Sequence, residues 1–137
     1  MNKFLGIVLV VMALGIAIVP TFTDCQSQGK AITLSSGKTV PMKCHWTGIA
    51  EIATGVPLAA VGVMMTFNRR RNSLFTLSVM GSILGIFAVL LPTSLIGVCT
   101  NMTALCNTVM KPALTAMGSV AIVGSLGAMM LARKAND

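Results

Sequence analysis

Apolar residues dominate four long stretches of this chain, at positions 4–22, 47–67, 74–98 and 109–132. Each stretch holds about 20 residues and almost no charge, and a helix that rises about 1.5 Å per residue then crosses a hydrocarbon layer of about 30 Å. A soluble domain of this size could not bury four helices that are apolar on every side. The pattern predicts an all-α membrane protein, with residues 1–137 forming a single four-helix transmembrane bundle.

The composition agrees with this class, since 55% of the 137 residues are hydrophobic and only 9% are charged. What remains is an inner loop at 68–73 and two outer loops at 23–46 and 99–108, too little for a soluble catalytic domain. The net charge of +7 does not indicate nucleic-acid binding. The basic residues flank the apolar stretches, where such residues usually set membrane orientation.

Every arginine falls on one side of the predicted bundle, and three of them, Arg69, Arg70 and Arg71, occupy the short inner loop. The positive-inside rule is strongest for short loops and places this one in the cytoplasm. We therefore expect a multi-pass protein of the inner or plasma membrane, with both termini cytoplasmic and both cysteine loops extracytoplasmic. The first stretch has no small-residue cleavage site after it, and we expect it to be retained as a span.

All four cysteines, Cys25, Cys44, Cys99 and Cys106, lie in or beside the two outer loops. An even number of cysteines confined to the oxidising side of a membrane predicts disulfides. Three pairings are possible, and we favour the local one, Cys25–Cys44 with Cys99–Cys106.

The first outer loop also predicts a β-hairpin. Residues 31–34 and 38–42 are rich in β-forming side chains and flank a Ser-Ser-Gly turn. An isolated hairpin is marginally stable in water, so we expect a disulfide at its base to hold it as a small cap outside the membrane.

Segment 42–51 holds the only histidine, the only tryptophan and the only acidic residue inside an apolar stretch. His45, Trp46, Thr47 and Glu51 are therefore a candidate polar or interaction site. In one interpretation Trp46 anchors the membrane interface and Glu51 accepts hydrogen bonds at the start of a helix. In the other, His45 and Glu51 form a site that binds a cation, a proton or a basic residue of a partner. No CxxC, HxxH or Met-x-Met spacing occurs, so we assign no metal site and no cofactor.

Small residues recur at four-residue spacing, in the pairs Gly55 and Ala59, Gly81 and Gly85, and Gly124 and Ala128. Such spacing predicts close helix packing within one chain or between copies, and it leaves the oligomeric state open.

These residues resemble an uncharacterised prokaryotic family of small four-span membrane proteins, the domain of unknown function four-four-one-eight. The resemblance covers nearly the whole chain and rests mainly on a Met-x-Cys-His-Trp-Thr motif. The residues that carry it are Met42, Cys44, His45, Trp46, Thr47, Ala50, Glu51, Gly97, Cys99, Cys106 and Pro112. It implies a prokaryotic membrane protein with no established activity, working beside an ABC-type permease of the MacB kind.

The layout is also similar to DsbB-type quinone-linked thiol oxidases and, more loosely, to relatives of vitamin K epoxide reductase. Those families use a CxxC pair, whereas Cys25 and Cys44 are 19 residues apart here and Cys99 and Cys106 are seven apart. A redox-active pair is usually closely spaced, with a lowered thiol pKa. The sequence therefore favours structural disulfides.

The spans hold almost no ionisable groups, and no nucleophile lies beside a base. We therefore expect a non-catalytic accessory or interaction subunit of a larger membrane complex, embedded in lipid beside other membrane subunits. Two alternatives stay open: a membrane thiol–disulfide oxidoreductase, and a carrier of protons or small cations that uses His45 and Glu51.

Overall fold

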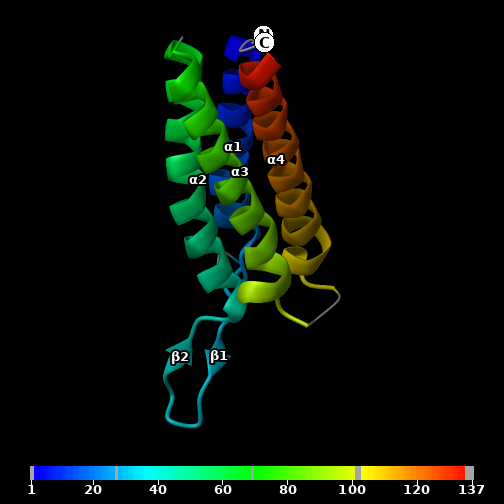
Figure 1. The fold of residues 1–137 in the computed structure, drawn as a ribbon. Helices are drawn as coiled ribbons and strands as arrows, with labels where there is room; N and C mark the ends of the chain where they lie inside the picture. The colour runs from blue at the N-terminus through cyan, green and yellow to red at the C-terminus, as the bar shows by residue number, and fades with distance from the viewer. Residues whose placement is uncertain (1, 27, 69, 101–102, 135–137) are drawn as a thin grey trace.

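The computed structural model describes residues 2–26, 28–68, 70–100 and 103–134. Most of the described chain is helical, and a small hairpin of two strands projects from one end (Figure 1). The elements are α1 (Asn2–Thr23), β1 (Ile32–Thr33), β2 (Thr39–Val40), α2 (Lys43–Phe67), α3 (Arg71–Leu90) and α4 (Lys111–Lys134).

Four helical segments are long and apolar enough to cross a membrane: Lys3–Thr23, Lys43–Phe67, Asn72–Leu95 and Cys106–Lys134. The prediction of four spans is confirmed at this level. Large apolar side chains such as Val11, Val56 and Val123 face outward and are more than half exposed. Lipid tails solvate such a surface as well as a protein interior does, so an apolar exterior is what a spanning bundle requires.

The helix ends differ from the sequence expectation where the cysteines lie. Helix α2 begins at Lys43, directly after Pro41 and Met42, so its first turn includes residues expected in the outer loop. Helix α3 ends at Leu90 and passes into a π-helical segment, η1 (Leu91–Leu95), which contains Pro92. A proline inside a helix removes one backbone donor and widens or breaks the turn.

A second π-helical segment, η2 (Cys106–Met110), leads directly into α4. Extra residues are therefore inserted into the helical turns on both sides of the second outer loop. Such insertions are rare in proteins overall, and those that occur are often found at functional sites.

Glycines bring consecutive helices close together. A Cβ atom on Gly62 of α2 would lie 2.9 Å from Val10 Cγ2 and 3.1 Å from the carbonyl oxygen of Gly6 on α1. A Cβ atom on Gly85 of α3 would lie 3.4 Å from the carbonyl oxygen of Gly118 on α4. Small residues allow such close backbone approach, which is a main source of helix association in membranes.

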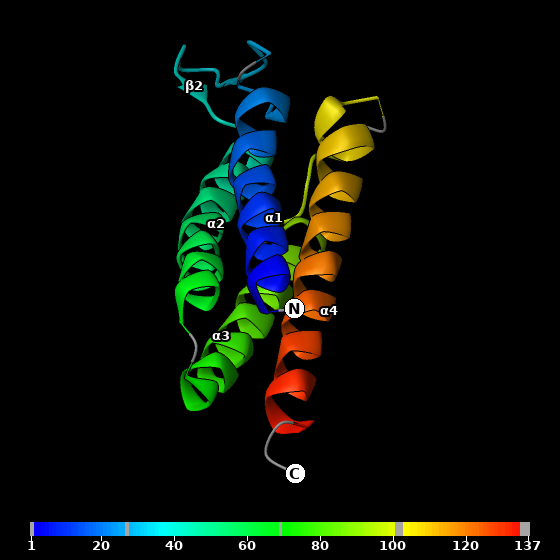
Figure 2. The same cartoon turned by 90° about the horizontal axis from the view of Figure 1, so that it is seen from above.

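Each helix packs against two neighbours, in the cyclic order α1, α2, α3, α4 (Figure 2). Of the predicted packing glycines, Gly55 and Gly81 contact neighbouring helices of the same chain. A Cβ atom on Gly124 would meet nothing within 4 Å among the described residues.

The two ends of the bundle differ in chemistry. Segments 24–26, 28–42, 96–100 and 103–105 lie at one end, here called the cysteine end. The end of α2, the start of α3, the start of α1 and the end of α4 lie at the opposite end (Figure 1). There the Arg133 guanidinium lies 5.9 Å from the ring centre of Phe75. Arg69, expected with Arg70 and Arg71 in the inner loop, lies outside the described residues.

The hairpin is antiparallel, with Ile32 opposite Val40 and Thr33 opposite Thr39. Gly37 has a φ of 76°, a conformation that glycine adopts without steric cost, and it closes the turn. The predicted hairpin is therefore present with shorter strands than expected. The disulfide expected at its base, Cys25–Cys44, is not the one that the structure contains.

Candidate functional site

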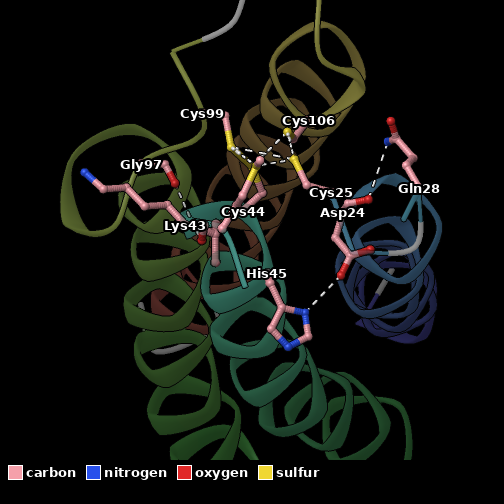
Figure 3. The surroundings of a disulfide bond; sticks show 11 residues. Asp24, Cys25, Gln28, Lys43, Cys44, His45, Gly97, Cys99 and Cys106 are labelled. Carbon is pink, nitrogen blue, oxygen red and sulfur yellow. Dashed lines mark hydrogen bonds and ion pairs between the residues drawn. A yellow bond between two sulfur atoms is a disulfide. The ribbon is translucent and has the colours of Figure 1, made fainter. Parts of the chain in front are cut away.

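The four cysteines converge on one point at the cysteine end (Figure 3). Their Sγ atoms all lie within 4.8 Å of one another. Cys25 follows α1, Cys44 lies in the first turn of α2, Cys99 lies between η1 and η2, and Cys106 is the first residue of η2. Because antiparallel helices bring every second chain connection to the same end, both outer loops contribute to one cluster, here called the four-cysteine cluster.

Cys44 and Cys99 form a disulfide, with their Cα atoms 6.2 Å apart. Cys25 and Cys106 carry free thiols. The Sγ atom of Cys44 lies 3.1 Å from that of Cys25 and 2.9 Å from that of Cys106. Cys25 and Cys106 are also 3.1 Å apart. The local pairing Cys25–Cys44 with Cys99–Cys106 is therefore wrong for this structure, because helix packing places Cys44 beside Cys99 from the other loop.

A hydrogen bond between the two halves of the bundle positions Cys99. The Thr47 hydroxyl, one turn after Cys44, donates to the carbonyl oxygen of Gly97 at 2.7 Å. Gly97 has a φ of 77°, which a residue with a Cβ rarely adopts, and it turns the chain where η1 ends. Thr47 is fully buried, so no bulk water competes for this bond. The bond fixes the backbone two residues before Cys99.

The sulfurs differ in their access to solvent. Cys25, Cys44 and Cys106 are buried, and Cys99 is half-buried. Cys99 lines a cavity of about 350 Å³ between the hairpin and the bundle. The other lining residues are Ile32, Met42, Lys43, Val98 and Thr100. A molecule that reaches the four-cysteine cluster through this cavity therefore meets Cys99 first.

Burial raises the pKa of the Cys25 thiol to about 11, with smaller contributions from its hydrogen bond with Cys106 and from the negative charges of Cys106 and Asp24. At neutral pH Cys25 therefore holds its proton and acts as a hydrogen-bond partner for its neighbours rather than as a nucleophile.

His45 lies beside the four-cysteine cluster and pairs with Asp24, not with Glu51 as one of the two interpretations of the sequence had it. Its Nδ1 atom is 3.1 Å from Asp24 Oδ2, an ion pair when the imidazole is protonated. The pair borders a smaller cavity of about 160 Å³, which Pro20 and Ile52 also line. Trp46 is 55% exposed, and its position fits an interfacial anchor.

Glu51 is fully buried, and neither carboxyl oxygen has a hydrogen-bond partner in the part of the chain that the structure describes. Cys44, Thr47 and Glu51 recur at spacings of three and four residues, which places them on one buried face of α2. The structure therefore separates the expected site into two: His45 joins Asp24, while Thr47 and Glu51 lie below the four-cysteine cluster.

Sequence reasoning missed the four-cysteine cluster, the pairing of His45 with Asp24 and the role of Gly97. The signal for the cluster was present, since each cysteine stands at the same end of a predicted span. The prediction considered only how far apart the cysteines are along the chain, so it did not show that all four lie close together in the fold.

Residues 4–131 match the family described as a domain of unknown function, DUF4418. No curated protein and no solved structure gives a significant match. This result confirms the family that the Met-x-Cys-His-Trp-Thr motif suggested, while prokaryotic origin and work beside a permease remain predictions. The chain belongs to the DUF4418 family.

Proposed function

We propose that this protein exchanges disulfides with thiol-containing partners through its four-cysteine cluster, at the extracytoplasmic face of the cell membrane. One observation carries the proposal. The Cys44–Cys99 disulfide has two free thiols within 3.1 Å of Cys44 Sγ, and its other sulfur, on Cys99, lines a cavity. Thiol–disulfide exchange requires a thiol in contact with a disulfide sulfur and access for the partner.

Atoms and electrons balance in this exchange, because the Cys44–Cys99 disulfide itself oxidises the partner. A partner thiolate attacks Cys99 Sγ, a bond between the partner and Cys99 forms, and Cys44 leaves as a thiolate. A second partner thiolate then attacks the partner sulfur of this mixed disulfide and releases Cys99. The partner loses two electrons and two protons, and Cys44 and Cys99 gain them. Exchange with a second disulfide, of a protein or a small molecule, restores the Cys44–Cys99 bond.

One of the buried thiols can also exchange with the disulfide inside the protein. Attack of Cys106 Sγ on Cys44 Sγ forms a Cys44–Cys106 disulfide and releases Cys99 as a thiolate, with no net oxidation. The two atoms are 2.9 Å apart, and Cys25 keeps its proton at neutral pH. A disulfide can thus move between the half-buried and the buried sulfurs.

The orientation of the bundle supports this assignment. The arginine-bearing turn, Arg133 and Lys134 belong at the cytoplasmic side by the positive-inside rule. The four-cysteine cluster is then extracytoplasmic, where disulfides form and persist.

The test is a single-turnover reaction. Purified oxidised protein in mild detergent is mixed with a reduced peptide that contains two cysteines, quenched by alkylation and weighed by mass spectrometry. We expect one peptide disulfide per protein, with Cys44 and Cys99 newly alkylated. The Cys99→Ser variant is the matched control, and it should react at least about tenfold more slowly because it lacks the Cys44–Cys99 disulfide and any other disulfide it forms lies between buried cysteines.

Two outcomes would overturn the proposal. A Cys44–Cys99 bond that survives excess dithiol peptide is a permanent cross-link. A Cys99→Ser variant that oxidises the peptide as fast as the wild type shows that the cavity is not the route. Circular dichroism checks that the variant keeps its helices.

A second candidate function, an accessory subunit of a larger membrane complex, is favoured by the hairpin. Ile32, Leu34 and Val40 are apolar, and each is more than two-fifths exposed. An apolar projection of this kind suits docking to another protein. Affinity purification of the Ile32→Ser/Val40→Ser variant tests it. Loss of a partner that the wild type retains at equal stoichiometry supports this role, and retention of that partner argues against it.

A further inference from the structure

The four-cysteine cluster has the composition and closeness of a tetrathiolate metal site. Four sulfur donors come from four different parts of the chain and lie within 4.8 Å of one another (Figure 3). In a tetrahedral zinc site with Zn–S bonds of about 2.3 Å, the sulfurs are about 3.8 Å apart. The separation between Cys25 and Cys99, 3.6 Å, is already near this value, and Cys25 and Cys106 are 3.1 Å apart. Small side-chain rotations bring the remaining pairs to the required spacing once the disulfide opens.

We infer that the fully reduced four-cysteine cluster binds one Zn²⁺ ion through all four cysteines. The Cys44–Cys99 disulfide first takes up two electrons and two protons from a dithiol or a phosphine. The four thiols then lose four protons as one Zn²⁺ binds, which leaves a complex of net charge −2. Oxidation to the disulfide removes two ligands and releases the metal.

The surroundings of the four-cysteine cluster offset this negative charge. Cys44 is the second residue of α2, and Cys106 begins the helical segment that leads into α4. The positive end of each helix dipole therefore points at the sulfurs. The exposed Lys43 side chain adjoins Cys44 and places a positive charge beside the four-cysteine cluster. Asp24 acts in the opposite direction.

The donor set also identifies the class of metal and of site. Four thiolates in a compact arrangement suit soft or borderline cations with a tetrahedral preference, of which Zn²⁺ is the common divalent one. Three of the four donors are buried. The four cysteines together fill all the coordination positions of a tetrahedral metal. Such closed sites are structural, and this one would join the ends of all four helices at the cysteine end.

The experiment uses Co²⁺ as a spectroscopic substitute for Zn²⁺. The full-length protein in mild detergent is reduced with a phosphine, which supplies no thiol ligand, and titrated with Co²⁺ and then with Zn²⁺. We expect the intense visible absorption of tetrahedral tetrathiolate cobalt, saturating at one ion per chain and abolished when Zn²⁺ displaces it. Oxidised protein should give no such spectrum.

Variants separate this site from adventitious binding. Cys25→Ser and Cys106→Ser each remove a ligand and should lower the affinity for Co²⁺ by at least about a hundredfold. Met42→Leu is the matched control. The Met42 sulfur lies 4.0 Å from Cys99 Sγ but is not needed to complete the four ligands, so this variant should bind as the wild type does.

The inference is overturned if reduced protein gives no tetrahedral thiolate spectrum, or if the spectrum persists in Cys25→Ser and Cys106→Ser. Because these measurements contain no peptide partner, their failure leaves the exchange reaction standing. Conversely, if the cluster binds metal but never oxidises a peptide, the exchange function is wrong and the metal site stands.

Discussion

Replacing Glu51 by methionine should stabilise the protein. The Glu51 side chain is fully buried within α2, and neither oxygen has a hydrogen-bond partner among the residues that the structure describes. Buried polar groups are nearly always paired, because leaving one unpaired costs about 1–3 kcal/mol. Methionine is unbranched, flexible and of similar volume, so it fills the same space without polar atoms.

The size of the effect follows from two opposing contributions. Removing the unpaired carboxyl should gain about 1–3 kcal/mol, and imperfect repacking of a side chain of similar volume should cost less than about 1.5 kcal/mol. The midpoints of these ranges, about 2 and about 0.75 kcal/mol, give an expected net gain in unfolding free energy of about 1–2 kcal/mol. That gain is about a fivefold to thirtyfold change in the unfolding equilibrium constant, since about 1.4 kcal/mol corresponds to tenfold.

The assay is a reversible unfolding titration in mixed micelles, following helicity as the fraction of denaturing detergent rises. Glu51→Gln is the matched control, because it keeps the shape and the unpaired polar atoms and should gain little. If Glu51→Met lowers the unfolding free energy by more than about 1 kcal/mol, the carboxyl is paired in the membrane and the reasoning is refuted. If the gain is found, Glu51 is kept at the expense of stability, which marks it as a functional residue.

Three further predictions concern packing and the thiols. Thr47→Val should lower the unfolding free energy by about 0.5–1.5 kcal/mol by removing the hydrogen bond to the carbonyl oxygen of half-buried Gly97, whereas Thr47→Ser should retain most of the wild-type value in the same titration. Gly62→Leu should separate α1 from α2, because even a Cβ atom there lies 2.9 Å from Val10 Cγ2; a loss of about 1–3 kcal/mol is expected, and unchanged stability would contradict the close packing. In protein that keeps the Cys44–Cys99 disulfide, alkylation of Cys25 should keep rising by about tenfold per pH unit to about pH 11, because its raised pKa leaves it protonated below that value; peptide mapping that finds a plateau near pH 9.0 would contradict this.

The four spans could be predicted because lipid offers no hydrogen-bond partners, so a spanning segment must be one continuous apolar helix. The start of α2 could not. Residues Lys43 to Trp46 carry charge and polar atoms typical of a loop, yet they form the first turn after Pro41. The helix extends beyond its apolar stretch because a polar first turn is tolerated where it leaves the hydrocarbon layer.

The site was harder to predict because its partners are brought together by tertiary packing. Cys44 and Cys99 are 55 residues apart and meet only when the two helical hairpins pack. His45 and Glu51 are six residues apart, which places them about 120° apart around a helix and explains why they do not meet. The four-residue spacing of Thr47 and Glu51 is enough to place them on one helix face, but it could not indicate what the neighbouring segments present to that face.

The Cys44–Cys99 bond also changes the topology of the polypeptide. Together with α2, α3 and the turn that joins them, it closes a covalent ring through residues 44–99, whose two long sides run the length of the bundle. In the oxidised protein, a backbone cut within that turn leaves a single molecule whose halves stay joined at the opposite end. In the reduced, metal-free protein the same cut yields two hairpin fragments with no covalent link, which associate only through side-chain packing and hydrogen bonds such as that from Thr47 to Gly97. The redox state of two sulfur atoms therefore determines whether a covalent bond holds the two halves of the bundle together at the cysteine end.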